Sequence, residues 1–389
     1  MKIILQKNFL KEALKNFSLV ENRRTTPSNI KNIKIEATDK ITLSQTDLEN
    51  NFIIELKGEI VAKGKAFINL NLLKKAINSS KEKSIVIESD SVKLNVNKIP
   101  QNLEEEGSTP IFFKTSKFFD PVSLNVPKFL EALEIVTPFA EEEKETTDKQ
   151  RLDMVLITPS GRFVATDGHR LNIFDSNIKV PDLLKYNIND AVSKPGILLS
   201  KKIANILLSI KNISSLELSF AKDNQQKDYF MLSGNSKFFN FTFITKQIEW
   251  FYPDYERAIP TETPATKISI SKSEFLNMLD AIKPLSKNRY IYGTATFFPS
   301  DKKVIAKLEN DKKEVLVNLN ANKNIIVTYR VKYLLDYKNI LEKNKDGDIT
   351  FFMDDNTSTT VVKIDNLDNL ICLLMPYRLE EYEIEDLKK

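Results

Sequence analysis

One layout recurs six times along this chain of 389 residues. Each copy has a short run of alternating apolar and polar residues, then a polar or proline step, then an amphipathic stretch typical of a helix of about three turns. The copies lie at Lys2–Phe17, Ala66–Ser79, Val122–Val136, Gly196–Ile210, Thr266–Ile282 and Ile325–Leu341. Because the helical parts start at intervals of about 60 to 75 residues, the pattern favours a repeated architecture.

Runs with the character of β-strands, bounded by polar turns, separate the six helical stretches. They lie at Ile33–Ser44, Asn51–Glu59, Ser84–Val96, Arg162–Asp175, Tyr229–Thr245, Thr294–Leu319 and Ile349–Ile364. Pairs of helical units with their strands form three similar blocks. The sequence therefore predicts an α+β protein with domains at residues 1–120, 121–250 and 251–379, each with antiparallel sheets and two helices. An acidic C-terminal tail follows at residues 380–389.

Capping residues agree with the predicted helix ends. Asn125 can cap the third helix, and either Ser271 or Ser273 can cap the fifth. Pro138 and Pro284 follow these two helices and are expected to end them, because proline lacks the backbone N–H that a helix interior needs.

The composition leaves little material for several kinds of chemistry. One His and one Cys provide almost no zinc ligands, and a lone Cys cannot form an internal disulfide. None of the nine glycines forms a pair with the spacing of a phosphate-binding loop. We therefore expect no metal and no other cofactor.

The first residues carry charges among their apolar side chains, and no apolar run reaches the roughly 18 residues of a membrane span. The sequence predicts neither a secretory signal nor a membrane segment, and hence a cytoplasmic protein.

The net charge of +4 is unevenly distributed. Residues 380–389 contain five acids and two lysines, so the rest of the chain carries +7. Lysines lie on the polar sides of several predicted helices, among them Lys201 and Lys202. Two interpretations remain open for them: one basic face that meets a nucleic acid, or ordinary solvated helix surfaces.

The only histidine lies in the motif TDGHRL at Thr166–Leu171. A hydrolase with Asp167, His169 and a neighbouring Ser is one interpretation. The other is a turn in which Gly168 supplies an unusual backbone conformation and its polar neighbours are structural.

Three ordered motifs, far apart in the chain, carry a family resemblance. TDGHRL is followed by YPDYERAIP at Tyr252–Pro260 and by MPYRL at Met375–Leu379. In combination they resemble the bacterial DNA sliding clamp, the beta subunit of DNA polymerase III. Weaker matches extend the resemblance over nearly the whole chain: Arg24 before a Thr/Pro segment, Thr46–Glu49, Leu285–Lys287 and Tyr329–Asp336.

The resemblance implies three copies of one clamp domain, with two subunits closing a homodimeric ring whose hole is lined by helices. It implies a non-catalytic processivity subunit that encircles duplex DNA without sequence preference. The expected partners are the replicative DNA polymerase, the clamp loader and repair polymerases, bound through short peptide motifs. The expected location is the cytoplasm, associated with the nucleoid.

The resemblance also carries over site residues. A partner-peptide pocket is expected from Leu152, Thr166, Gly168, His169, Arg170, Leu171, Pro253, Arg257, Ala258, Met375, Pro376, Tyr377, Arg378 and Leu379. DNA contacts are expected from Arg24, Lys201 and Lys202. The dimer interface is expected to place Lys93, Leu94 and Val96 of one subunit against Leu285 of the other, with Lys93 near acids at Glu309–Glu314.

The chain departs from the family pattern at several positions. Tyr252 replaces the usual Phe before Pro253, and Arg330 stands where Asn is usual. Residues 380–389 continue beyond the MPYRL motif, where related clamps often end. Two interpretations of this tail are open: it is disordered, or Tyr382, Ile384 or Leu387 folds over the pocket and competes with partner peptides. A monomeric scaffold of the same fold that has lost the ring is a further alternative to the clamp.

Overall fold

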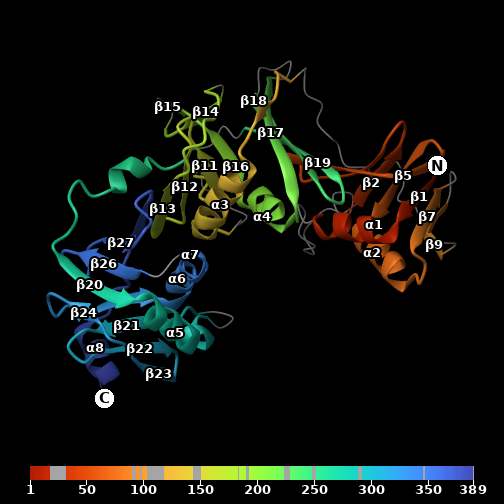
Figure 1. Cartoon of the computed structure of the whole chain (residues 1–389). Helices are drawn as coiled ribbons and strands as arrows, with labels where there is room; N and C mark the ends of the chain where they lie inside the picture. The colour runs from red at the N-terminus through yellow and green to blue at the C-terminus, as the bar shows by residue number, and fades with distance from the viewer. Residues whose placement is uncertain are drawn as a thin grey trace. The chain divides into compact units, whose positions relative to one another are not determined.

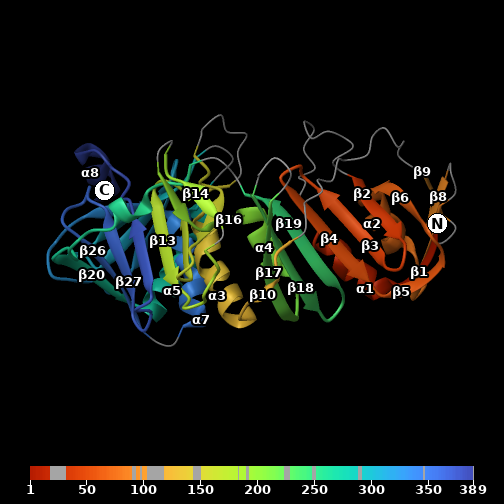
Figure 2. The same cartoon turned by 90° about the horizontal axis from the view of Figure 1, so that it is seen from above.

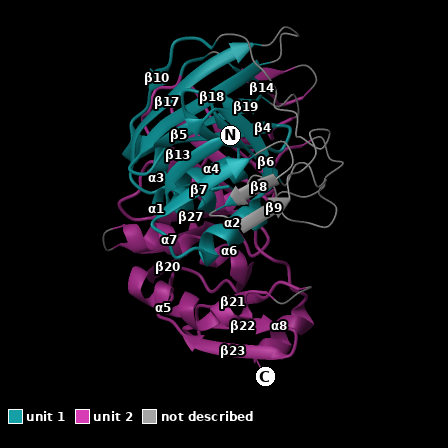
Figure 3. Ribbon diagram, turned by 90° about the vertical axis from the view of Figure 1, so that its right-hand side faces the viewer, with its two compact units in different colours: residues 1–130, 181–186, 195–249 teal, residues 131–180, 187–194, 250–389 magenta. Residues whose placement is uncertain are grey.

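The computed structural model describes residues 1–17, 32–89, 93–96, 99–102, 118–142, 150–182, 184–189, 192–222, 228–247, 251–287, 291–344 and 347–388 (Figure 1). The chain divides into two compact units (Figure 3). Unit 1 comprises Met1–Leu130, Pro181–Tyr186 and Pro195–Glu249, and unit 2 comprises Glu131–Val180, Asn187–Lys194 and Trp250–Lys389.

Unit 1 contains two antiparallel sheets. The first has the strand order β5 (Gly58–Ala62), β1 (Lys2–Gln6), β7 (Ser84–Ser89), β8 (Lys93–Val96), β9 (Ile99–Asn102). The second has the order β10 (Val122–Ser123), β17 (Ile213–Lys222), β18 (Asp228–Ser236), β19 (Asn240–Lys246), β4 (Asn50–Leu56), β3 (Ile41–Thr46), β2 (Asn32–Ala37), β6 (Gly64–Asn69). The helices of unit 1 include α1 (Lys7–Lys15), α2 (Leu70–Ser79) and α4 (Lys201–Ser209), the last preceded by β16 (Ile197–Ser200).

Unit 2 also contains two antiparallel sheets. The strands of one sheet that belong to unit 2 are, in order, β11 (Met154–Ile157), β12 (Arg162–Thr166), β13 (Arg170–Asp175), β28 (Leu370–Leu374), β27 (Thr360–Ile364), β26 (Asp348–Met353), β20 (Thr266–Ser271), β24 (Asn320–Ala321), and β16 precedes β11 in that sheet. The strands β13, β27 and β26 of this sheet are labelled in Figure 2. The other sheet has the order β23 (Asp311–Leu316), β22 (Lys303–Leu308), β21 (Thr294–Phe298), β25 (Val327–Arg330).

The helices of unit 2 include α5 (Lys272–Ile282), α6 (Val331–Leu335), α7 (Tyr337–Lys343) and α8 (Glu381–Lys388). Short 3-10 helices lie at η3 (Thr137–Phe139), η4 (Tyr255–Ala258) and η5 (Lys283–Leu285). Helix α3 (Val126–Val136) and the strands β14 (Lys185–Asn187) and β15 (Ser193–Pro195) each cross a boundary between the units along the chain.

All six strand–helix units predicted from the sequence are confirmed. In each, a strand leads into a helix: β1 into α1, β6 into α2, β10 into α3, β16 into α4, β20 into α5 and β25 into α6. Their apolar residues form the core, as in α5, where Phe275, Met278 and Leu279 are fully buried. The sixth helix differs from the prediction because it is divided at Asp336 into α6 and α7.

The predicted caps are also confirmed. The side chain of Asn125 accepts a hydrogen bond from the backbone N–H of Lys128 (3.2 Å). The side chain of Ser271, rather than that of Ser273, accepts from the backbone N–H of Glu274 (3.4 Å). Pro138 and Pro284 lie in the 3-10 helices η3 and η5, which follow α3 and α5.

The two compact units do not follow the three predicted domains, because sheets continue from one predicted domain to the next. In unit 1, β19 pairs with β4 and Phe243 stacks on Phe52, with ring centroids 4.3 Å apart. In unit 2, β13 pairs with β28. The compact units bring together strands that pair with each other, even when these are far apart in the chain. The predicted domains instead follow the repeated pattern along the sequence. The three-domain division therefore stays a prediction.

The expectation of a disordered tail is wrong. Residues 381–388 form α8, and the side chain of Leu387 is only 3% exposed. It is buried against Phe298 and Ile305 in the sheet that contains β21 and β22.

Among the described residues, every helix is too short or too polar to cross a membrane.

The cap of α5 provides a stability test. We expect Ser271→Ala to lower the free energy of unfolding by about 1 kcal/mol, because an orphan N–H of the first turn loses its acceptor. Ser273→Ala is the matched control and should change it by less than about 0.5 kcal/mol. Urea denaturation followed by circular dichroism measures both, and equal losses would contradict the assignment of the cap.

Candidate functional site

The TDGHRL motif forms the tight turn between β12 and β13. Gly168 has φ +83°, in the left-handed region that favours glycine. The carboxylate of Asp167 accepts hydrogen bonds from the backbone N–H groups of His169 (3.0 Å) and Arg170 (2.9 Å), and Thr166 Oγ1 accepts from Gly168 N–H (3.1 Å). The polar residues of the motif therefore build the turn, as one of the two interpretations of the sequence held.

This geometry does not support a catalytic triad. The Asp167 carboxylate binds backbone amides and the Arg170 guanidinium instead of orienting the imidazole. The imidazole of His169 is exposed and lies 6.2 Å from the ring of Tyr333 on α6. A general base needs a partner that holds its ring and a nucleophile within hydrogen-bond reach.

Arg170 supports the site from beneath. Its side chain is only 3% exposed, and its guanidinium binds Asp167 (Nε to Oδ2, 3.1 Å) and Asp336 (Nη1 to Oδ2, 2.5 Å). The guanidinium carbon lies 4.2 Å from the ring of Tyr333 and 4.9 Å from that of Phe139. Burial alone lowers the pKa of Arg170, but the two carboxylates outweigh it and the pKa lies above its ordinary value. Arg170 thus ties the turn to η3 and to the junction of α6 and α7.

The MPYRL motif continues from β28 beside this turn. Strand β28 pairs with β13, with Leu374 opposite Arg170. The N–H of Met375 donates to the carbonyl of His169 (2.9 Å), and the N–H of Tyr377 donates to the carbonyl of Thr328 on β25 (2.7 Å). The side chains of Met375 and Tyr377 are 47% and 41% exposed.

Aromatic side chains and one guanidinium gather next to this segment. Arg330, at the end of β25, has its guanidinium carbon 5.6 to 5.8 Å from the rings of Tyr292, Tyr333 and Tyr377. Tyr292 is 44% exposed. We call the exposed side chains of His169, Tyr292, Met375 and Tyr377, together with Arg330, the partner surface. Its composition, mostly apolar and aromatic with a few polar groups, is the composition of a ligand site.

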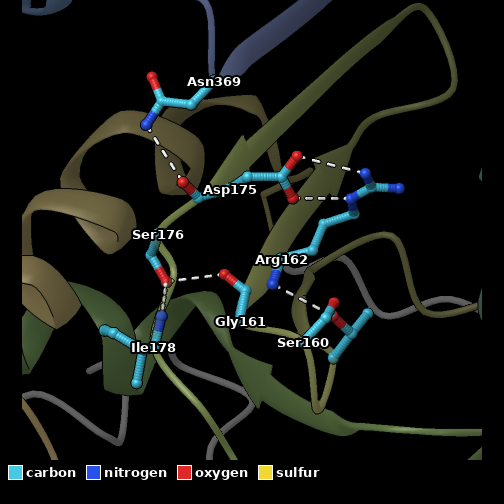
Figure 4. A network of polar contacts seen from close by, with 8 residues as sticks. Ser160, Gly161, Arg162, Asp175, Ser176, Ile178 and Asn369 are labelled. Carbon is cyan, nitrogen blue, oxygen red and sulfur yellow. Dashed lines mark hydrogen bonds and ion pairs between the residues drawn. The ribbon is translucent and has the colours of Figure 1, made fainter.

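The opposite ends of β12 and β13 are held by a polar network (Figure 4). The guanidinium of Arg162 makes two hydrogen bonds to the carboxylate of Asp175 (2.9 and 3.2 Å). Asn369, just before β28, donates to the carbonyl of Asp175 (3.1 Å). Ser176 Oγ donates to the carbonyl of Gly161 (2.7 Å), whose φ of +86° and close approach to Ile178 exclude a larger residue. The hairpin that carries the TDGHRL turn is therefore fixed at both ends.

The YPDYERAIP motif is anchored to the same hairpin. The hydroxyl of Tyr252 donates to the carbonyl of Val164 on β12 (3.0 Å), so the replacement of the usual Phe adds a satisfied buried hydrogen bond. Pro253 is half-buried, whereas Arg257 and Ala258 on η4 are exposed. Arg257 pairs with Asp254 (3.0 Å).

The other residues predicted for the pocket differ in exposure. Thr166 and Leu171 are buried, with 7% and 5% exposed. Leu152, Pro376 and Leu379 are half-buried, and Arg378 is exposed. The Cβ of any side chain placed at Gly168 would lie 3.7 Å from Leu152, so these two residues are neighbours.

Sequence reasoning missed several residues of the site. The sequence does not predict Phe139, Tyr292 or Tyr333 as site residues. Asp336 belongs only to a weak match, and Arg330 is only a departure from the family pattern. Tyr333 and Asp336 lie within the Tyr329–Asp336 match, so that match could have revealed them. No sequence signal connects Phe139 or Tyr292 to the motifs.

The residues predicted for DNA and dimer contacts are placed as follows. Arg24 lies outside the described residues. Lys201 and Lys202 occupy the first turn of α4, half-buried, with Lys202 Nζ 3.9 Å from Asp47 Oδ2. Lys93 and Leu94 lie on β8, and their side chains are outside the described part. Val96 is fully buried and Leu285 is 8% exposed, so within the chain both are core residues. Leu316, on the edge strand β23, is instead 80% exposed.

The chain is similar to known proteins along most of its length. No family model matches it. It is 22% identical over 385 residues to the beta sliding clamp of Pseudomonas aeruginosa, covering 93% of this chain and 95% of that protein. It is 26% identical over 308 residues to the beta sliding clamp of Helicobacter pylori, covering 74% of each.

Solved structures agree over almost the whole chain. The sliding clamp of Bartonella birtlesii bound to griselimycin is 18% identical with a TM-score of 0.74, covering 97% of this chain and 100% of that one. The Helicobacter pylori beta clamp bound to a DNA ligase peptide is 19% identical with a TM-score of 0.69, with the same coverage. The chain is therefore similar to bacterial beta sliding clamps over most of its length and has the fold of the solved ones.

Proposed function

We propose that this chain is a DNA sliding clamp, the beta subunit of DNA polymerase III. Two copies close a ring around duplex DNA and tether the replicative polymerase for processive synthesis. The observation that carries the proposal is the likeness to clamps over 97% of the chain, with the TDGHRL and MPYRL motifs joined in one site. The protein is a non-catalytic subunit of the polymerase, located in the cytoplasm with the nucleoid.

The partner surface is the proposed site for the polymerase, the clamp loader and repair polymerases. Solved relatives of this fold bind griselimycin and a DNA ligase peptide. Each large apolar side chain of a partner buried there contributes roughly 1.5–3 kcal/mol. Two or three such anchors, less the cost of ordering the peptide, correspond to dissociation constants on the order of micromolar. Binding of that strength allows partners to exchange.

DNA is proposed to be held by enclosure more than by affinity. Phosphate contacts from Lys201, Lys202 and Arg24 position the ring without reading sequence. A net charge of +4 on the whole chain is small for a protein that grips DNA by charge alone, yet it suits a mildly basic hole.

For the ring interface we retain Lys93, Leu94, Val96 and Leu285 as proposed contributors, and we add Leu316. An edge strand presents unpaired N–H and C=O groups that can pair with the edge strand of another chain. Strand β23 is such an edge in unit 2, as β9 is in unit 1. A contact between unlike surfaces that closes after two copies gives a ring.

Enclosure predicts retention that depends on DNA topology. After loading by a clamp loader, the protein should stay on a nicked circular plasmid through gel filtration and leave once the plasmid is cut. A linear DNA blocked at both ends by bound protein is the control and should retain it. Escape at equal rates from circular and linear DNA would reject the clamp proposal.

The ring interface predicts a change of mass. The wild-type protein should sediment at about 89 kDa, twice the chain mass of 44.6 kDa. Leu316→Asp should shift it toward the monomer, because a carboxylate buried without a partner opposes association. Val61→Asp is the control, since Val61 is 51% exposed on β5, the other edge of its sheet. A wild-type monomer at micromolar concentration would favour the scaffold alternative.

The partner surface predicts selective loss of peptide binding. Met375→Ala and Tyr377→Ala should each weaken binding of a fluorescent clamp-binding peptide from a bacterial DNA polymerase by about tenfold or more. Leu72→Ala, which truncates a similarly exposed residue on α2, should leave it unchanged. Fluorescence anisotropy measures the affinities, and equal affinity for all three variants would contradict the site.

A further inference from the structure

Helix α8 packs on the same unit that carries the partner surface. Leu387 is 3% exposed and forms a buried cluster with Phe298 on β21 and Ile305 on β22. Three half-buried apolar side chains pack against this cluster: Ile326, Leu379 and Ile384. Two of the six residues come from α8 itself, and one, Leu379, is the last residue of the MPYRL motif.

Hydrogen bonds fix both ends of α8. At its start, the N–H of Glu380 donates to the carboxylate of Glu383 (2.8 Å), and the N–H of Ile384 donates to the carbonyl of Glu380 (3.2 Å). At its end, Lys312 Nζ on β23 donates to the carbonyl of Leu387 (2.6 Å). A cation at the last turn is also favourable for the helix dipole. The helix is thus docked on the sheet by its apolar side and by its C-terminal end.

The segment between β28 and α8 is held by two backbone hydrogen bonds and by the contact of the Tyr377 ring with the Arg330 guanidinium. Met375 and Tyr377 each donate one backbone hydrogen bond, to His169 and Thr328. Their side chains are nearly half exposed, so they add little burial. The next anchor along the chain is Leu379, and it packs against the cluster that Leu387 completes. Leu379, two residues after Tyr377 in the chain, is therefore the point at which this segment packs into an apolar cluster.

We propose that α8 is a positioning element for the partner surface: its docking through Leu387 holds Leu379, and through it the Met375–Tyr377 segment, in the conformation that binds peptides. This inference rests on the proposed function, because it concerns the same site. It predicts the opposite effect on peptide binding from the interpretation in which the tail covers the pocket and competes with partners. Loss of docking should weaken peptide binding, whereas loss of a competitor would strengthen it.

The size of the expected loss of peptide affinity follows from the fraction of chains whose Met375–Leu379 segment is in the conformation that binds peptides. If undocking lowers the fraction of chains with an ordered Met375–Leu379 segment to between a tenth and a third, the apparent affinity falls by about three- to tenfold. Direct contact between α8 and the peptide is not required.

The experiment uses the full chain with Leu387→Ala. We expect peptide affinity to fall about three- to tenfold by fluorescence anisotropy, and the backbone N–H of Tyr377 to exchange faster with deuterium. Tyr382→Ala, which truncates a side chain of α8 that is 68% exposed, is the matched control and should change neither quantity. Ile268→Ala, in the fully buried part of β20, controls for a general loss of stability. It should lower the urea midpoint without changing exchange at Tyr377.

The outcomes separate this inference from the proposed function. Unchanged or tighter peptide binding by Leu387→Ala, with unchanged exchange at Tyr377, would overturn the positioning role. If the wild-type protein binds no peptide at all, the proposed peptide site fails. The exchange of Tyr377 N–H then still decides whether α8 orders this segment, because that measurement needs no ligand.

Discussion

The buried guanidinium of Arg170 is the interaction on which the arrangement of the partner surface depends. A buried charge costs several kcal/mol unless it is paired and hydrogen-bonded. The guanidinium pairs with Asp167 in the same turn and with Asp336 between α6 and α7. The rings of Phe139 and Tyr333 cover the cation. Three segments of the chain, around Phe139, Arg170 and Asp336, are thereby held at one point, and removing either carboxylate would leave the buried guanidinium with a single counterion.

Strand pairing also holds the MPYRL motif next to the TDGHRL turn. Because β28 lies between β13 and β27, the strand that leads into MPYRL is hydrogen-bonded on both sides. The turn residue His169 and the first motif residue Met375 then meet as neighbours at the end of paired strands. A backbone that is already held in place on both sides loses little conformational freedom when a ligand binds beside it, and this lowers the cost of recognition.

Periodicity predicted the six strand–helix units and the caps at Asn125 and Ser271, because these depend on local spacing and local hydrogen bonds. It did not predict the cluster around Arg330, whose members come from separate elements and share no local pattern. Helix α8 was missed for a different reason. Its two packed apolar residues, Ile384 and Leu387, are three apart in an acidic run, and so short a pattern is also typical of a disordered tail. Phe298 and Ile305, which cover Leu387, lie on β21 and β22, far from it in the chain, so sequence alone could not identify its partners.

The chemistry of the partner surface explains why a weak, reversible contact suits it better than a reaction. Its histidine is exposed and unsupported by a carboxylate, and its nearest acids are committed to Arg170. What remains exposed is a thioether, two phenol rings and a guanidinium beside them. Such groups bind by burial and by contact between cations and aromatic faces, which are non-covalent and individually modest. Affinity then depends on how well the backbone segment that carries Met375 and Tyr377 is ordered before the partner arrives. The supports of that segment, Arg170 and α8, therefore contribute to the binding strength together with the exposed side chains.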